Sequence, residues 1–114
     1  MAETVVMASG VSAKTGEAPD PRYVFDLWAY DEMTLSLTLL MLNSEDAEAW
    51  VAVTLETSMD SGPKARWQAL GAFSPMIEGG TDVRRFSGFL RYVRWQLMSN
   101  AEAAVVFDLR GMAR

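Results

Sequence analysis

The chain has 114 residues and a mass of 12.6 kDa, the size of one compact domain, and half of these residues are apolar. It contains no cysteine and no histidine, which excludes disulfides, zinc–thiolate sites and catalysis that depends on either side chain. Ten lysines and arginines against fifteen aspartates and glutamates give a net charge of −5, which disfavours direct binding to nucleic acid.

The sequence carries no sign of a secretion signal or a membrane span. An acidic residue, Glu3, stands where a signal peptide carries basic residues. The most apolar stretch, residues 33–42, is interrupted by Thr34, Ser36 and Thr38, so it is too short and too polar to cross a bilayer. We therefore expect a protein made in a cytoplasm, with no membrane partner.

Residues 1–22 differ in composition from the rest of the chain. Residues 4–8 predict a short strand, and residues 9–21 are small, polar and interrupted by glycine and proline. This first segment is either an edge strand followed by a long loop or an extended arm that reaches a neighbouring subunit. In both cases the remaining residues, 23–114, form the sandwich domain described below.

Strict alternation of apolar and polar residues is the main signal for secondary structure. Between residues 33 and 41 every odd position is apolar, and hydroxyl side chains occupy positions 34, 36 and 38. Residues 51–56 and 105–110 follow the same rule, with valine, leucine or phenylalanine at each odd position. Such alternation is typical of strands that bury one face in a core and expose the other.

Weaker strand signals fill the intervals between these segments. Residues 23–28 and 66–73 are rich in aromatic or β-branched side chains, and residues 84–98 predict a bent strand or two short strands that meet at Gly88. Helices over residues 84–98 and 44–49 are the alternatives. Turn residues separate the segments at 43–46, 60–63 and 78–81, and we interpret the glycine pair in the last of these as a hairpin turn.

These segments together predict an all-β protein. Short strands separated by turns, without a long amphipathic helix, are typical of β-sandwiches. We expect a single antiparallel β-sandwich of about seven or eight strands, jelly-roll-like or discoidin-like in type, with residues 1–22 at its edge or extended from it.

No arrangement of residues in the sequence points to catalysis, a cofactor or a metal ion. Without histidine the serines lack their usual activating base, and Gly79 and Gly80 are not followed by the lysine of a phosphate-binding loop. Neighbouring carboxylates occur at residues 31–32 and 45–48, but without the regular spacing of a calcium-binding loop. We expect a protein that is not an enzyme, with no cofactor and no metal ion.

The candidate interface residues are two tryptophans and four arginines: Trp28, Trp50, Arg84, Arg85, Arg91 and Arg94. The two tryptophans fall opposite the main apolar faces, so they either pack under loops or are exposed for a protein contact or for stacking on a sugar. The four arginines concentrate in one predicted hairpin region. They either neutralise acidic neighbours within the chain or form complementary charge patches between identical subunits.

Three motifs occur in the chain: residues 53–60 (VTLETSMD), 67–73 (WQALGAF) and 91–95 (RYVRW). They resemble small β-sandwich proteins encoded among the structural genes of tailed bacteriophages, and the similarity extends over residues 23–111. The chain differs from these proteins in lacking a longer loop rich in threonine and glycine after Asn43.

The resemblance implies a virion component, such as a decoration or cement protein on the capsid or a small tail or head–tail accessory protein. The implied partners are the major capsid protein or other virion proteins, together with further copies of the chain. The implied location is the virion, assembled in the cytoplasm of a bacterial host.

A second hypothesis rests on the shape of the fold. The same sandwich shape occurs in discoidin-like modules that bind sugars or surfaces, so fold alone does not decide between the two functions. The alternative is therefore a carbohydrate- or surface-binding module of a tail or an adhesion structure, which uses Trp28 or Trp50.

Overall fold

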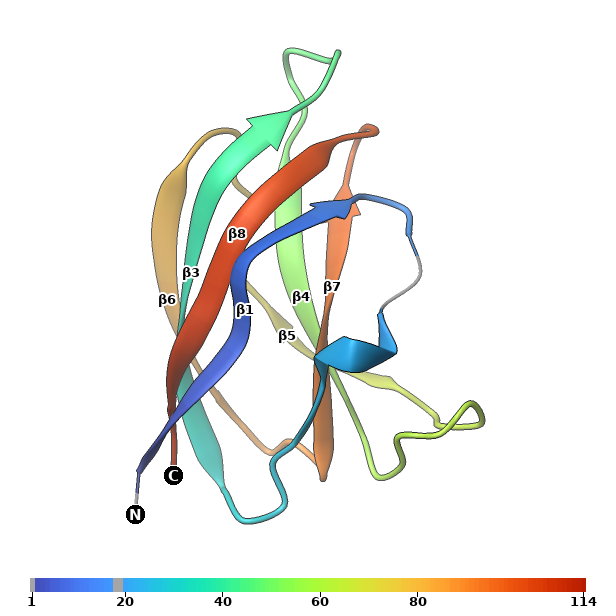
Figure 1. The fold of residues 1–114 in the computed structure, drawn as a ribbon, viewed down its shortest axis with the longest axis vertical. Helices are drawn as coiled ribbons and strands as arrows, with labels where there is room; N and C mark the ends of the chain where they lie inside the picture. Colours follow the sequence, from blue (N-terminus) through green and yellow to red (C-terminus); the bar gives the residue numbers. More distant parts are fainter. Residues whose placement is uncertain (1, 18–19) are drawn as a thin grey trace.

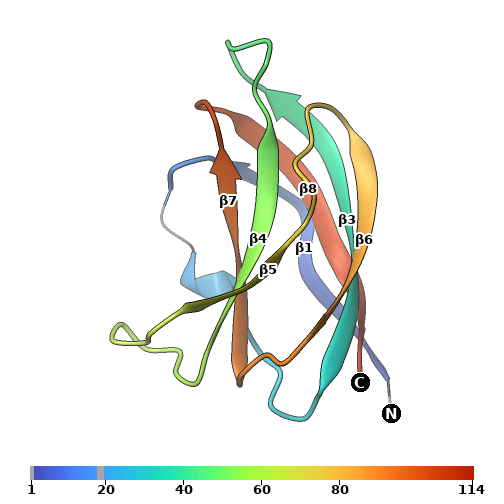
Figure 2. The ribbon, with the colours of Figure 1, turned by 180° about the vertical axis from the view of Figure 1, so that it is seen from behind.

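The computed structural model describes residues 2–17 and 20–114, which form eight strands and one short 3-10 turn. Two antiparallel sheets of four strands pack face to face as a β-sandwich, as Figure 1 and Figure 2 show from opposite sides. The predicted all-β sandwich is thereby confirmed. The elements are β1 (Glu3–Lys14), η1 (Pro21–Tyr23), β2 (Val24–Asp26), β3 (Glu32–Asn43), β4 (Val51–Ser58), β5 (Gln68–Ala72), β6 (Gly80–Ser87), β7 (Tyr92–Ser99) and β8 (Ala104–Ala113).

The strand order shows how the chain is folded back on itself. The first sheet has the order β1-β8-β3-β6 and the second has the order β2-β7-β4-β5. Within them, β1 pairs with β8, β2 with β7, β3 with β6 and β4 with β5. These pairs are nested, as if one long hairpin with its bend between β4 and β5 had been rolled into two layers.

The three segments with strict alternation form β3, β4 and β8. Their odd-numbered apolar residues point into the space between the sheets as far as Leu39 in β3, and Leu35, Leu55, Val105, Phe107 and Leu109 are completely buried. Met41 is the exception: a register shift between Leu39 and Met41 interrupts the alternation and leaves Met41 47% exposed. Full burial of one such side chain stabilises a fold by about 1.5–3 kcal/mol, so this shared interior is the main source of stability.

The weaker strand predictions are also confirmed, but the two predicted hairpins are not. Residues 84–98 form the end of β6 and most of β7, and neither they nor residues 44–49 are helical. Gly88 separates the two strands with a φ of 73°, a conformation that glycine adopts most easily. Because β6 and β7 belong to different sheets, the predicted arginine hairpin is wrong. The glycine pair before β6 is likewise no hairpin turn, since it connects the two sheets.

The segment predicted as an edge strand with a loop or as an arm contains a longer edge strand than expected, from Glu3 to Lys14. The prediction of a loop beginning at residue 9 is wrong, because residues 9–14 continue the pairing with β8. β1 pairs with β8 from Glu3 to Lys14, with two shifts of register between Val6 and Val11. Met7 is buried in the core, and its carbonyl oxygen accepts a hydrogen bond of 3.2 Å from the indole of Trp95. Residues 1, 18 and 19 of this segment lie outside the described residues.

Residues 2–17 and 20–114 include no helix that is long and apolar enough to span a membrane.

Candidate binding surface at one end of the sandwich

The six predicted interface residues do not form one patch. Trp28 and Arg91 meet at the end of the sandwich where β2 and β4 finish and β7 begins. Trp50 precedes β4 at the opposite end and is half-buried. Its backbone N–H donates to the side-chain oxygen of Asn100 at 2.9 Å. Arg84 and Arg85 lie on β6 in the other sheet.

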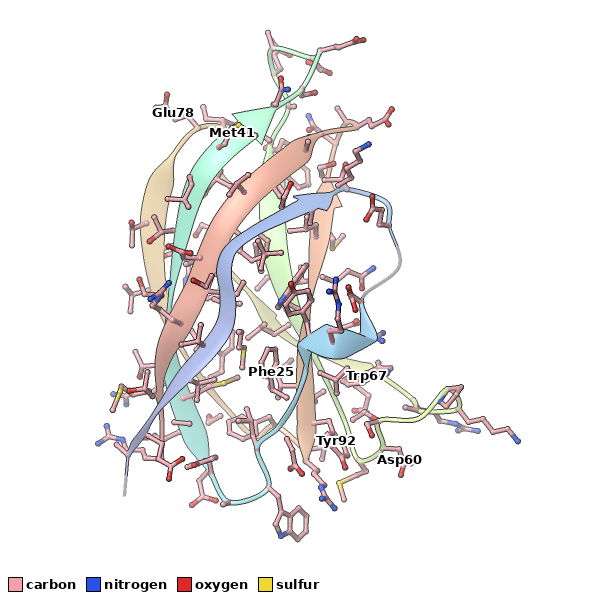
Figure 3. All side chains as sticks on the ribbon, viewed as in Figure 1. Phe25, Met41, Asp60, Trp67, Glu78 and Tyr92 are labelled. Carbon is pink, nitrogen blue, oxygen red and sulfur yellow. The ribbon has the colours of Figure 1, made fainter. Side chains whose placement is uncertain are left out.

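Five exposed or half-buried residues at this end form a group that we call the Trp28 surface: Asp26, Trp28, Met59, Arg91 and Tyr92. Figure 3 shows Tyr92 and Asp60 near this end and Met41 and Glu78 at the opposite end. The group comes from three separate chain segments, at the ends of β2 and β4 and at the beginning of β7, and each strand positions its own segment.

A local anchor turns Trp28 outward. The preceding Leu27 is buried, its N–H donates to the carbonyl of Arg91 at 2.8 Å, and its own carbonyl accepts from Tyr30 at 3.0 Å. The backbone N–H of Trp28 donates to the Asp26 carboxylate at 3.1 Å. The chain is therefore fixed on both sides of an indole that remains 69% exposed. Tryptophan combines a large apolar ring with a polar N–H group and is enriched at protein interfaces.

Arg91 connects this indole to a carboxylate and to a second ring. Its Nη2 atom lies 2.9 Å from Oδ2 of Asp26, and its guanidinium carbon lies 5.7 Å from the ring centre of Trp28 and 5.1 Å from that of Tyr92. Both ring distances fall within the range of cation–π attraction. The hydrogen bond from Arg91, followed by the one from the N–H of Trp28, lowers the pKa of Asp26 below its usual value. Asp26 is therefore ionised at neutral pH and holds Arg91 beside both rings.

A projecting loop completes the surface on its other side. Met59 follows β4, is 52% exposed and begins the loop of residues 59–65. A groove of about 530 Å³ lies between this loop and the side chains of Arg91 and Tyr92. The buried hydroxyl of Ser58 accepts from the N–H of Asp60 at 3.1 Å, which fixes the start of the loop.

Arg94 has a different role from Arg91. Its guanidinium carbon lies 4.2 Å from the ring centre of Trp67, and its Nε atom lies 2.9 Å from Oε1 of Glu56. The side chains of Arg94 and Glu56 are only 21% and 23% exposed. This half-buried group joins β4 and β7 to the beginning of β5, so Arg94 acts within the chain.

The three segments from which a relation to phage proteins is expected come together in the second sheet. Residues 53–60 lie in and after β4, residues 67–73 contain β5, and residues 91–95 begin β7. These strands are neighbours in the order β7-β4-β5. The segments therefore form one continuous structural unit, and their ends supply Met59, Arg91 and Tyr92 to the Trp28 surface.

Most arginines are neutralised inside the chain. Six ion pairs join described residues: Arg22–Asp20, Arg84–Asp82, Arg91–Asp26, Arg94–Glu56, Arg110–Asp108 and Arg114–Glu32. For three of the four predicted interface arginines, the intramolecular interpretation is therefore the one that the structure shows. Arg85 is exposed on β6 and has no ion-pair partner among the described residues.

Sequence reasoning missed three members of the Trp28 surface. Met59 and Tyr92 lie just outside the main alternating positions, and Asp26 looks like an ordinary solvated acid two residues before Trp28. The signal that could have located Met59 and Tyr92 is their place in the segments 53–60 and 91–95, next to a strand end in each case.

The acidic side chains do not form a metal site. In the described part of the chain, no group of three or more of them is placed to hold a metal ion.

Comparison with known proteins gives no match: no family model, no curated protein and no solved structure is significantly similar to the chain.

Proposed function

We propose that the protein is a non-enzymatic structural component of a phage or phage-like particle, most simply a capsid decoration or cement protein, which binds neighbouring virion proteins through the Trp28 surface. The observation that carries the contact is the 69% exposed indole of Trp28, whose flanking backbone is held by hydrogen bonds. Tryptophan, tyrosine and arginine are the residue types that contribute most to binding energy at protein interfaces. Arg91 lies beside this indole, and Tyr92 lies beside Arg91.

We infer in addition that the sandwich is a jelly roll. The nested strand pairs and the two sheets of four strands support this type, which occurs in viral capsid domains and in lectins. The analogy is one of fold and fits both a virion role and sugar binding. The resemblance of residues 53–60, 67–73 and 91–95 to phage structural proteins favours the virion role.

The proposal assigns the contact to loop aromatics and not to residues 1–22. Met7 and Ala8 of β1 are buried in the protein's own core, so this strand cannot leave the sheet without exposing them. An arm that reaches a neighbouring subunit would have to use residues of the segment 1–22 other than these buried ones.

Quantitative mass spectrometry of purified particles tests the virion role directly. A decoration protein should be present at a simple ratio to the major capsid protein, whereas a few copies per particle would place it in the tail or neck. Absence of the chain from particles would overturn the proposal.

The contact itself is tested with Trp28→Ala. We expect this variant to bind particles that lack the protein about thirtyfold more weakly, which corresponds to about 2 kcal/mol, because the main apolar anchor is lost. Co-sedimentation with such particles measures the effect. Ile77→Ala is the matched control, since Ile77 is 70% exposed and lies at the opposite end of the sandwich. Equal binding by the two variants would contradict the assignment of the contact to the Trp28 surface.

The second candidate is a carbohydrate- or surface-binding module that uses the same residues. The specific observation in its favour is that a flat exposed ring, a carboxylate and a guanidinium lie next to a groove, since sugars are bound by aromatic faces and a few fixed polar groups. A saturable change in tryptophan fluorescence on titration with a glycan would support it. The change should disappear in Trp28→Ala and persist in Trp50→Ala.

A further inference from the structure

The strand β6 presents the longest regular free edge of the sandwich. It lies at the outside of the first sheet in both Figure 1 and Figure 2, and no described strand pairs with its outer side. Its eight residues pair with β3 without a shift of register. The other three edges are interrupted or short: β1 has two register shifts, β2 has three residues and β5 has five. A long, regular edge is a template on which a further strand can form.

The sequence at the middle of this edge is complementary to itself. Asp82 and Arg84 pair with inward-facing leucines of β3, so both lie on the inward face of β6. Val83 lies on the other face and is 58% exposed. In an antiparallel pair of two β6 strands centred on Val83, each Asp82 faces an Arg84 of the other copy, and the two valines face one another. The same register places Arg85 opposite Thr81.

The charged side chains are already held in position for such a pair. The N–H of Ser74 donates to the Asp82 carboxylate at 3.0 Å, and Arg84 donates to the Ser74 hydroxyl at 2.5 Å. Asp82 and Arg84 also form an ion pair of 3.2 Å within the strand. A second copy would add its own pair and complete a group of four alternating charges. Groups fixed before association lose less entropy when they bind.

We propose that a second copy of the chain pairs with β6 edge to edge, antiparallel, about a twofold axis through Val83. The two first sheets then form one continuous sheet of eight strands across the dimer. Opposite charges directly across a strand pair stabilise it, and the twofold symmetry provides every contact twice. The inference deepens the proposed function by naming one partner of the protein, but it involves a different surface from Trp28.

The first test is the mass of the purified protein in sedimentation equilibrium. We expect a dimer of twice the 12.6 kDa chain mass. A monomer at all concentrations would overturn the inference and leave the proposed contact of the Trp28 surface untouched, because this experiment contains no virion protein.

Charge variants test the register. Asp82→Arg leaves only positive charges at positions 82 and 84 of the two copies, and Arg84→Asp leaves only negative ones there, so the dimer of each variant alone should dissociate at least tenfold more readily. An equimolar mixture of the two should form a heterodimer, and the double variant Asp82→Arg/Arg84→Asp should dimerise again. Circular dichroism of each variant checks its fold. Dimerisation of either single variant at the wild-type level would exclude this register.

A cross-linking experiment tests the position of the axis without altering the charges. The chain has no cysteine, so Val83→Cys introduces a single thiol next to its symmetry mate. Under mild oxidation we expect a disulfide-linked dimer. Val6→Cys is the matched control, because Val6 is 46% exposed at the other edge of the same sheet. Equal cross-linking of the two variants would contradict the proposed axis.

Discussion

Gly111 shows how a single backbone contact restricts the sequence. It lies in β8 between two strands, paired with Val5 of β1 and with Leu35 of β3. A Cβ atom at this position would lie 1.8 Å from the carbonyl oxygen of Thr34, a backbone atom that cannot shift without disturbing the pairing. We therefore expect Gly111→Ala to lower the free energy of unfolding by about 3 kcal/mol, at the upper end of the usual cost of overpacking.

Urea denaturation of this variant against Gly80→Ala measures the effect. Gly80 is also a strand glycine, but a Cβ there would have no atom within 4 Å, so its replacement should change the free energy of unfolding by less than about 0.5 kcal/mol. Equal midpoints for the two variants would show that β8 has room at Gly111.

Residues with a repeating pattern were the ones that the sequence predicted well. Leu35, Leu55 and Phe107 are buried because each belongs to a strand that alternates strictly, and one buried face follows from that period alone. The exposure of Trp28 follows from the hydrogen bonds that hold Leu27 in the opposite direction. No local pattern specifies those contacts.

At the scale of elements, substitutions in β1 test whether this segment is an edge strand packed on the core or a detachable arm. Met7 of this strand is 1% exposed, so Met7→Ala should lower the free energy of unfolding by about 3 kcal/mol through the cavity that it leaves. Val6 is 46% exposed, so Val6→Ala should change the free energy of unfolding by less than about 0.5 kcal/mol. Guanidinium chloride denaturation compares the two. If Met7→Ala were as mild as Val6→Ala, β1 would not be packed on the core in solution.

The kind of each element was easier to predict than its partner. β6 and β7 were predicted as strands, yet they belong to different sheets, because closeness in sequence does not determine which strands pair. Residues 44–49 remain a loop because Ser44 and Asp46 accept hydrogen bonds from backbone N–H groups two residues ahead. Such local bonds compete with helix formation and are difficult to recognise in a single sequence.

For the whole molecule, the candidate site depends on topology. The Trp28 surface joins residues that follow β2, follow β4 and begin β7, and only the nested strand pairing places these three points at one end. The charge distribution depends on it too. Residues 1–57 carry ten acidic side chains against two basic ones, residues 58–114 carry five against eight, and the fold places the two halves against each other. Pairs such as Arg91–Asp26 and Arg94–Glu56 are the result.

These ion pairs make the stability of the fold sensitive to acid. Arg22 lowers the pKa of Asp20, Arg91 lowers that of Asp26, and the N–H of Ser74 lowers that of Asp82, in each case below the ordinary value of 3.8. A carboxylate with a lower pKa in the folded chain stabilises the fold at all pH values above its unfolded pKa. That contribution is lost as the pH falls through the folded value.

We therefore expect the free energy of unfolding to be nearly constant between about pH 5 and 8, because the chain has no histidine to titrate there, and to fall below about pH 4. Urea midpoints measured from pH 3 to 8 test this. Asp26→Asn should reduce the loss at low pH, since it removes one of these three carboxylates with a lowered pKa, and added salt should weaken the exposed pairs. A change of stability between pH 6 and 8 would show that groups other than these carboxylates control it.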